Sequence, residues 1–113
     1  MVAASFVDAI NRGDVAALGR LMTEDHALVV FDEPALVGRV ANIEAWRGYV
    51  ERFPDYRIHP HEIVEQGATV AILGHTTGSH LALPDAEERQ IAVLWRAEIA
   101  GAQVRRWTVT DPP

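Results

Sequence analysis

The fold is decided by four long extended segments in the second half of the chain: YRIHPHEIVE (56–65), TVAILGHTTGSH (69–80), QIAVLWRAEI (90–99) and QVRRWTVT (103–110). Short stretches that favour turns separate them, at residues 66–67, 83–86 and 100–102. Strands of about ten residues generally bend or coil, and Gly74 and Gly78 are the natural places for a bend. We predict an antiparallel meander that forms a curved sheet.

Working outward from these strands, the N-terminal residues predict two helices that meet at a tight corner. Apolar side chains recur at helical spacing from Ala3 to Ile10, and Gly13 can take the left-handed conformation that ends a helix. Asp14 is a good N-cap for a second short helix, whose apolar stripe runs to Met22.

A short strand and a third helix are predicted between these helices and the meander. Residues 26–31 favour a strand, which Pro34 interrupts, and Asn42 is expected to cap a helix whose apolar face ends at Phe53. Helices followed by a meander indicate an α+β fold. We predict a cone-shaped α+β roll, in which a curved, mainly antiparallel sheet wraps around about three N-terminal helices and leaves a central cavity. The chain length suits one domain over residues 1–113.

The amino-acid composition disfavours or excludes several classes of function. The chain has 10 basic and 16 acidic residues, and a net charge of −6 disfavours binding to nucleic acid or to an anionic membrane. It has no apolar run of the roughly 18 residues that a membrane span needs. It also has no cysteine, which excludes disulfides, thiolate nucleophiles and sulfur-ligated metals. We expect a cytoplasmic protein that uses no cofactor.

Several motifs together resemble a known family over nearly the whole chain. FVDAINRGD (6–14) resembles the opening helix and turn of the nuclear-transport-factor-2-like superfamily, which has the cystatin-like α+β roll. Its SnoaL-like polyketide cyclase branch has sequences similar to FPDY (53–56), GATV (67–70), TGSH (77–80) and VRRW (104–107). The superfamily includes polyketide cyclases, ketosteroid isomerases, limonene-type epoxide hydrolases, dehydratases and members that only bind or assemble. The resemblance therefore implies the fold and a homodimer, but no single activity.

Asp111 and His80 are the first candidates for catalysis. Strand alternation puts Trp107, Val109 and Asp111 on one face of the last strand. In SnoaL-like cyclases a carboxylate at a position like Asp111 is thought to act as a general acid or base, and an apolar pocket would favour that role. His80 completes the TGSH motif and could orient a carbonyl group or act as a base. The alternatives are a solvated terminal aspartate and a histidine bonded to loop backbone.

Asp32 and Glu33 form a second candidate site, because ketosteroid isomerases place their catalytic aspartate before a proline. Which of the two faces the cavity is open, since a shift of one residue flips the face of a strand. Phe6 and Trp95 stand where those isomerases have their oxyanion donors, so this mechanism is disfavoured. The epoxide hydrolase mechanism is also disfavoured. Limonene-type hydrolases need an Asp-Arg-Asp relay in the cavity, and we expect Arg96, the only arginine of the central strand, on the outer face of the sheet and Trp95 on the inner face.

The histidines offer a third candidate. A metal site built from His59, His61 and His75 is conceivable, because two imidazoles two residues apart on a strand can ligate one ion. Partly exposed histidines on the sheet surface are the preferred interpretation, and we expect no metal.

Large apolar side chains are expected to form both the core and the walls of the pocket. The predicted wall residues are Phe6, Phe31, Trp46, Trp95 and Trp107. The outer sheet face carries a mixed set of side chains, and we expect it to form the interface of a homodimer. That set is Leu73, His75, Thr77, Leu94, Arg96 and Glu98.

Three functional hypotheses follow. The first is a cofactor-independent cyclase, isomerase or hydratase that acts on a hydrophobic carbonyl compound with Asp111, His80 and Asp32 as catalytic groups. The second is a non-catalytic binder of a small apolar ligand. The third is a dimeric assembly domain whose sheet face is the functional surface.

Overall fold

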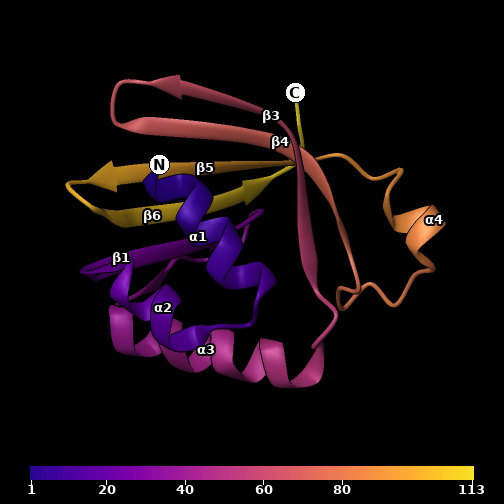
Figure 1. The fold of residues 1–113 in the computed structure, drawn as a ribbon, viewed down its shortest axis with the longest axis horizontal. Helices are drawn as coiled ribbons and strands as arrows, with labels where there is room; N and C mark the ends of the chain where they lie inside the picture. Colours follow the sequence, from indigo (N-terminus) through magenta and orange to yellow (C-terminus); the bar gives the residue numbers. More distant parts are fainter.

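The computed structural model describes all 113 residues, as four helices and one six-stranded sheet. The elements are α1 (Val2–Asn11), α2 (Val15–Arg20), β1 (Met22–Val30), β2 (Leu36–Val37), α3 (Arg39–Arg52), β3 (Arg57–Gln66), β4 (Thr69–Thr77), α4 (Asp85–Glu88), β5 (Val93–Ala100) and β6 (Gln103–Thr110). The strand order is β2-β1-β6-β5-β4-β3, and only the β1–β6 pair is parallel. Helices α1, α2 and α3 lie together on one side of the sheet (Figure 1). The α+β prediction is confirmed.

The corner between α1 and α2 forms as the sequence indicates. Gly13 has a φ of +62°, and the Asp14 carboxylate accepts a hydrogen bond from the Ala17 backbone N–H at 3.0 Å. The Asn11 side chain then ties this corner to the sheet. Its amide donates to the Ile58 carbonyl at 2.9 Å and accepts from the Ile58 N–H at 2.7 Å.

Three boundary predictions were wrong. The second helix ends at Arg20, so Met22 belongs to β1 and not to the helix. The first strand begins at Met22 rather than His26, because residues 22–25 belong to β1 and Met22 pairs with Val104 of β6. Asn42 does not cap the third helix. Gly38 stands at the N-cap with a φ of +112°, and Asn42 is buried one turn later. Its side-chain amide donates to backbone carbonyls of β1, β2 and the N-cap, so it joins α3 to the sheet.

The sheet curves at a defined place in its longest hairpin. The β3–β4 hairpin runs along the top of Figure 1 and then turns down beside the C-terminal end of α3. The register shifts between Pro60 and Glu62, and Gly74 lies opposite Pro60. Gly74 was a predicted bend position. A Cβ atom there would lie 2.2 Å from the His59 carbonyl oxygen, so the two backbones approach closely only because this residue has no side chain.

Replacing Gly74 with alanine is therefore expected to lower the free energy of unfolding by about 1–3 kcal/mol, because the added methyl group must push two paired strands apart. Gly48 is the matched control, since it lies inside α3 and a Cβ there meets nothing within 4 Å. Gly48→Ala is expected to raise the free energy of unfolding by about 0.4–1 kcal/mol. Urea unfolding of both variants measures the contrast, and equal effects would contradict the packing argument.

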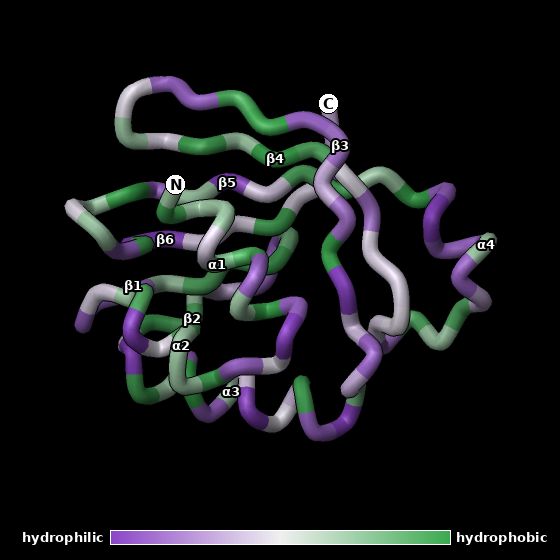
Figure 2. The backbone as a smooth tube through the Cα atoms, in the orientation of Figure 1, coloured by the Kyte–Doolittle hydropathy of each residue, from purple (hydrophilic) through white to green (hydrophobic).

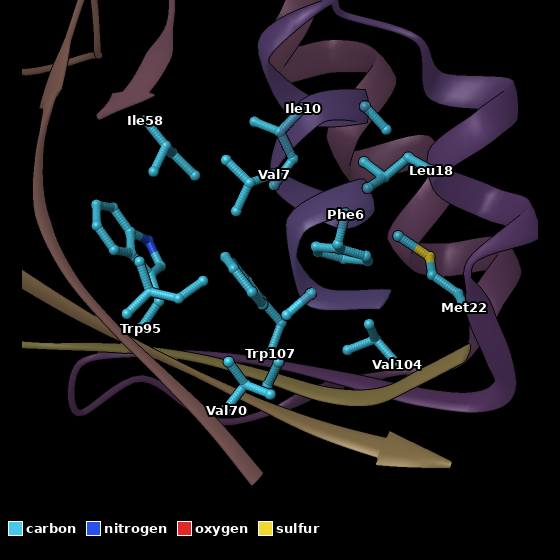
Figure 3. Packing of buried hydrophobic residues seen from close by; sticks show 14 of the residues in the cluster. Phe6, Val7, Ile10, Leu18, Met22, Ile58, Val70, Trp95, Val104 and Trp107 are labelled. Carbon is cyan, nitrogen blue, oxygen red and sulfur yellow. The ribbon is translucent and has the colours of Figure 1, made fainter. Parts of the chain in front are cut away.

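The core lies between the helices and the inner face of the sheet. Fifteen buried apolar residues form one cluster, which includes Phe6, Trp95 and Trp107 (Figure 3). Trp95 is 1% exposed whereas its neighbour Arg96 is exposed, so the predicted inner and outer faces of β5 are confirmed. Figure 2 shows hydrophobic and hydrophilic positions interleaved along the strands. No helix is long and apolar enough to cross a membrane.

Candidate functional site

A cavity of about 510 Å³ opens between α3, the segment after β4 and the inner face of the sheet. Its size falls in the range of small-molecule pockets. Thirteen of its 18 lining residues are hydrophobic. The lining consists of Leu28, Val30, Phe31, Glu33, Ala45, Trp46, Tyr49, Tyr56, Thr76, Ser79, His80, Leu81, Ile91, Val93, Trp95, Trp107, Val109 and Asp111.

Four of the five predicted wall residues line this cavity: Phe31, Trp46, Trp95 and Trp107. The fifth, Phe6, does not. It is fully buried in α1 and packs against Trp107, with ring centroids 4.8 Å apart, in a part of the core that the cavity does not reach. Figure 3 shows Phe6 beside Trp107. Helix α1 fills that part of the cone, so Phe6 supports the wall from behind.

The carboxylates Glu33 and Asp111 lie at the same end of the cavity. β1 and β6 run parallel, Val30 pairs with Val109, and the Phe31 N–H donates to the Val109 carbonyl at 2.8 Å. Because parallel strands end at the same edge of a sheet, the residues that follow them emerge together. Glu33 and Asp111 are both in the lining and both exposed, whereas Asp32 is not in the lining. Phe31 has a φ of +51°, and this turn brings Glu33 rather than Asp32 to the cavity.

His80 lines the cavity in a hydrogen-bonded pair with Tyr49. The His80 backbone N–H donates to the Tyr49 hydroxyl oxygen at 3.1 Å, and that hydroxyl lies 2.9 Å from His80 Nδ1. Since the hydroxyl proton then points at Nδ1, we assign Nδ1 as the acceptor and the proton of the neutral ring to Nε2. Burial raises the pKa of Tyr49, although the hydrogen bond from His80 opposes that shift, so Tyr49 keeps its proton at neutral pH.

Sequence reasoning missed Tyr49, although its spacing could have found it. Tyr49 follows Trp46 by three residues, which places both aromatic rings on one face of α3. Tyr56 was also missed. Burial raises its pKa, and the nearby Tyr49 and Glu88 add to the shift. The three rings pack together, with centroids 5.0 Å apart for Tyr49–Tyr56 and 6.2 Å for Trp46–Tyr49.

Glu88 of α4 is a buried acid directly behind the cavity wall. It is 1% exposed and accepts hydrogen bonds from the Thr76 hydroxyl and, at 3.4 Å, from the Ser79 backbone N–H. Thr76 and Ser79 both line the cavity. Glu88 therefore holds the segment between β4 and β5 in place, and that segment contributes Leu81 and Ile91 to the lining.

His26 is a structural residue rather than a cavity group. It is fully buried, and its Nδ1 lies 2.6 Å from the Val104 carbonyl oxygen, so Nδ1 carries the proton and donates it. Nε2 is buried without a partner. Burial lowers the pKa of His26 below 6.5, although the Val104 carbonyl and Asp25 act in the opposite direction.

This burial makes the stability of the protein depend on pH. As pH falls through 6.5, His26 of the unfolded chain takes up a proton that the folded chain does not, so the free energy of unfolding falls until the pH reaches the lower folded pKa. His26→Asn keeps a donor for Val104 but does not titrate. We expect it to be less stable at neutral pH and to lose less stability on acidification, as measured by urea unfolding across this range. An equally steep loss would contradict the assignment.

His59, His61 and His75 gather on the outer sheet face, as predicted for surface histidines. The rings of His59 and His75 stack with centroids 4.6 Å apart, and His61 Nε2 lies 2.7 Å from His75 Nδ1. His59 Nε2 bonds instead to the Thr77 hydroxyl at 2.8 Å. Burial, together with the neighbouring histidines, lowers the pKa of His75. No group of three metal-ligating side chains in the chain is arranged to hold a metal ion.

Solved structures similar to this chain share its fold. A cystatin-fold protein from Novosphingobium aromaticivorans is 18% identical with a TM-score of 0.80, over 96% of this chain and 93% of that one. An epoxide hydrolase from M. tuberculosis is 14% identical with a TM-score of 0.75, over 98% of this chain and 80% of that one. The Orange Carotenoid Protein of Anabaena, solved with canthaxanthin, is 18% identical with a TM-score of 0.77, over 96% of this chain and 34% of that one.

At these identities the solved structures bear on the fold alone. A search among curated protein sequences gives no match. The family profile described as the SnoaL-like domain matches residues 3–110, which is nearly the whole chain. The match covers every strand of the sheet and every residue that lines the cavity except Asp111. The chain therefore belongs to the SnoaL-like family, and its fold is similar to that of the cystatin-fold protein.

Proposed function

We propose that the protein is a cofactor-independent acid–base catalyst that acts on a hydrophobic carbonyl compound in this cavity. The observation that carries the proposal is that Asp111 and the hydrogen-bonded Tyr49–His80 pair line one cavity, most of whose lining residues are apolar. Apolar walls hold the body of the ligand, and a few polar groups at one place orient its reactive part. The indole N–H groups of Trp46 and Trp95 are buried without a partner, so they are further donors that a carbonyl oxygen could satisfy.

The proposed reaction moves a proton beside the carbonyl group. The Asp111 carboxylate accepts a proton from the carbon next to the carbonyl, and His80 Nε2–H donates a hydrogen bond to the oxygen on which negative charge develops. Tyr49 donates to Nδ1 and so keeps the Nε2 proton in place. The enolate then either takes back a proton or attacks a second carbonyl, as isomerisation or cyclisation requires.

The second candidate function is a binder without catalysis. The shape match to the Orange Carotenoid Protein, solved with canthaxanthin, supports it, because that protein holds an apolar ligand. The two candidates share the cavity and differ in whether Asp111 and His80 act on the ligand. A homodimer through the outer sheet face remains a prediction for either of them.

The experiment that separates them is hydrogen–deuterium exchange into ketones. Bicyclic to tetracyclic ketones are incubated with the protein in D₂O, and deuterium beside the carbonyl is followed by NMR. Binding is followed in parallel by tryptophan fluorescence, because all three tryptophans line the cavity. We expect exchange above the rate in buffer. Ketones that bind without exchange would favour the binder, and ketones that do not bind at all would overturn both candidates.

A further inference from the structure

The formally charged side chains that line the cavity are all acidic. All ten basic residues of the chain are arginines, and none of them is in the lining. Two carboxylates, Glu33 and Asp111, are in the lining, and neither makes a salt bridge. An anionic ligand would therefore meet repulsion and no counter-charge.

Glu88 is a third acidic residue at the cavity, behind the lining, and it is buried without a cationic partner. It is almost completely buried, yet no arginine or histidine lies within salt-bridge distance of it. Its two oxygens accept hydrogen bonds from the Thr76 hydroxyl and the Ser79 backbone N–H, neither of which carries a charge. Buried carboxylates are normally paired with a cation, because desolvation without one is costly. The protein itself supplies no such cation.

The cavity lined by Thr76 and Ser79 also has an aromatic wall. Trp46, Tyr49 and Tyr56 all line the cavity, and the Tyr49 ring stands nearly perpendicular to the other two, at 79° and 84°. Glu88 is connected to this wall through neighbouring backbone groups, because it accepts a hydrogen bond from the Ser79 N–H while the next N–H, that of His80, donates to the Tyr49 hydroxyl. Aromatic faces attract cations, and most strongly where water is excluded. A cation at this wall would lie against aromatic rings, and the Glu88 carboxylate stands behind Thr76 and Ser79 of the same cavity lining.

We propose that the ligand of this cavity is a hydrophobic amine, protonated at neutral pH, whose ammonium group faces the wall formed by Trp46, Tyr49 and Tyr56 and supplies the counter-charge that Glu88 lacks. This inference rests on the proposed function and makes it more specific, because the substrate of a catalyst would then carry an amino group as well as a carbonyl. The carboxylates of Glu33 and Asp111 at the cavity edge also favour the entry of a positively charged ligand.

The test uses three compounds with one apolar body: adamantyl amine, adamantyl alcohol and adamantane carboxylate. Calorimetry and tryptophan fluorescence measure their binding to the wild-type protein at neutral pH. We expect the amine to bind at least about tenfold more tightly than the alcohol, and the carboxylate to bind most weakly. In Glu88→Gln the preference for the amine should shrink by a similar factor. Glu24→Gln is the control, because Glu24 is exposed and lies outside the lining.

The outcomes separate this inference from the proposed function. If the alcohol binds as tightly as the amine, or the carboxylate binds best, the inference is overturned while the cavity remains a binding site. If none of the three compounds binds and ketones do not bind either, both proposals are overturned. Because the comparison of ligands needs only the wild-type protein, a failure of Glu88→Gln to fold leaves the test decisive.

Discussion

Trp107→Ala is expected to lower the free energy of unfolding by about 3–5 kcal/mol, which is among the largest losses that a single core substitution causes. Trp107 is 1% exposed and lies on β6, which pairs with β1 on one side and β5 on the other. Its ring also packs against Phe6 of α1. The substitution removes contacts with three elements at once and opens the core toward the cavity. Chemical unfolding followed by circular dichroism measures the loss.

Phe31 provides the matched control, since it is also an aromatic residue of the cavity wall but is 48% exposed. Phe31→Ala should weaken ligand binding while lowering the free energy of unfolding by less than about 1.5 kcal/mol, because little area is lost from the core. If Trp107→Ala is too unstable to purify, Trp107→Phe should show a smaller loss that can still be measured. A loss for Trp107→Ala no greater than that for Phe31→Ala would contradict the packing described here.

The parts of the fold that could be predicted depend on local signals. Gly13 ends α1 and Asp14 caps α2 because each acts within a few residues of its own position in the chain. The four strands of the meander follow from turn residues and from long β-favouring runs. The inward position of Trp95 follows from the alternation of one strand, and needs no knowledge of the others.

The features that could not be predicted depend on contacts between distant residues. The parallel pairing of β1 with β6 joins Met22 to Val104, and no sequence signal near either residue predicts it. Asn42 looked like a cap because asparagine favours that position, but its amide is used to bind carbonyls of β1 and β2. Such hydrogen bonds depend on how the helices and strands pack together, and the periodicity of the sequence does not predict this packing.

The candidate site also has features that local signals predict and features that depend on contacts between distant residues. Asp111 and Trp107 were placed on one face of a strand by alternation alone, and both line the cavity. The choice between Asp32 and Glu33 depended on a turn whose geometry, with positive φ at Phe31, no residue type there requires. Glu88 was missed because a glutamate in an acidic loop normally faces solvent, whereas here Thr76 and Ser79 draw it inward.

Asp111→Asn is expected to slow the proposed exchange into ketones by about 10²–10⁴-fold, because an amide cannot accept the proton that the carboxylate removes. The effect should fall on kcat, with little change in KM, since asparagine has nearly the same size and Asp111 lies at the edge of the cavity. His80→Gln should also lower kcat, because it removes the Nε2–H donor. Initial exchange rates, measured by NMR over a range of ketone concentrations, give kcat and KM.

Asp32→Asn is the matched control for Asp111→Asn, because it makes the same chemical change in a carboxylate that lies near the cavity but outside its lining. It should leave the exchange rate unchanged, whereas Glu33→Gln tests the carboxylate that does line the cavity. If Asp32→Asn slows exchange as much as Asp111→Asn, the turn after β1 does not separate the two positions as described. If Asp111→Asn exchanges at the wild-type rate, Asp111 is not the base, and Glu33 is the carboxylate in the lining that could replace it.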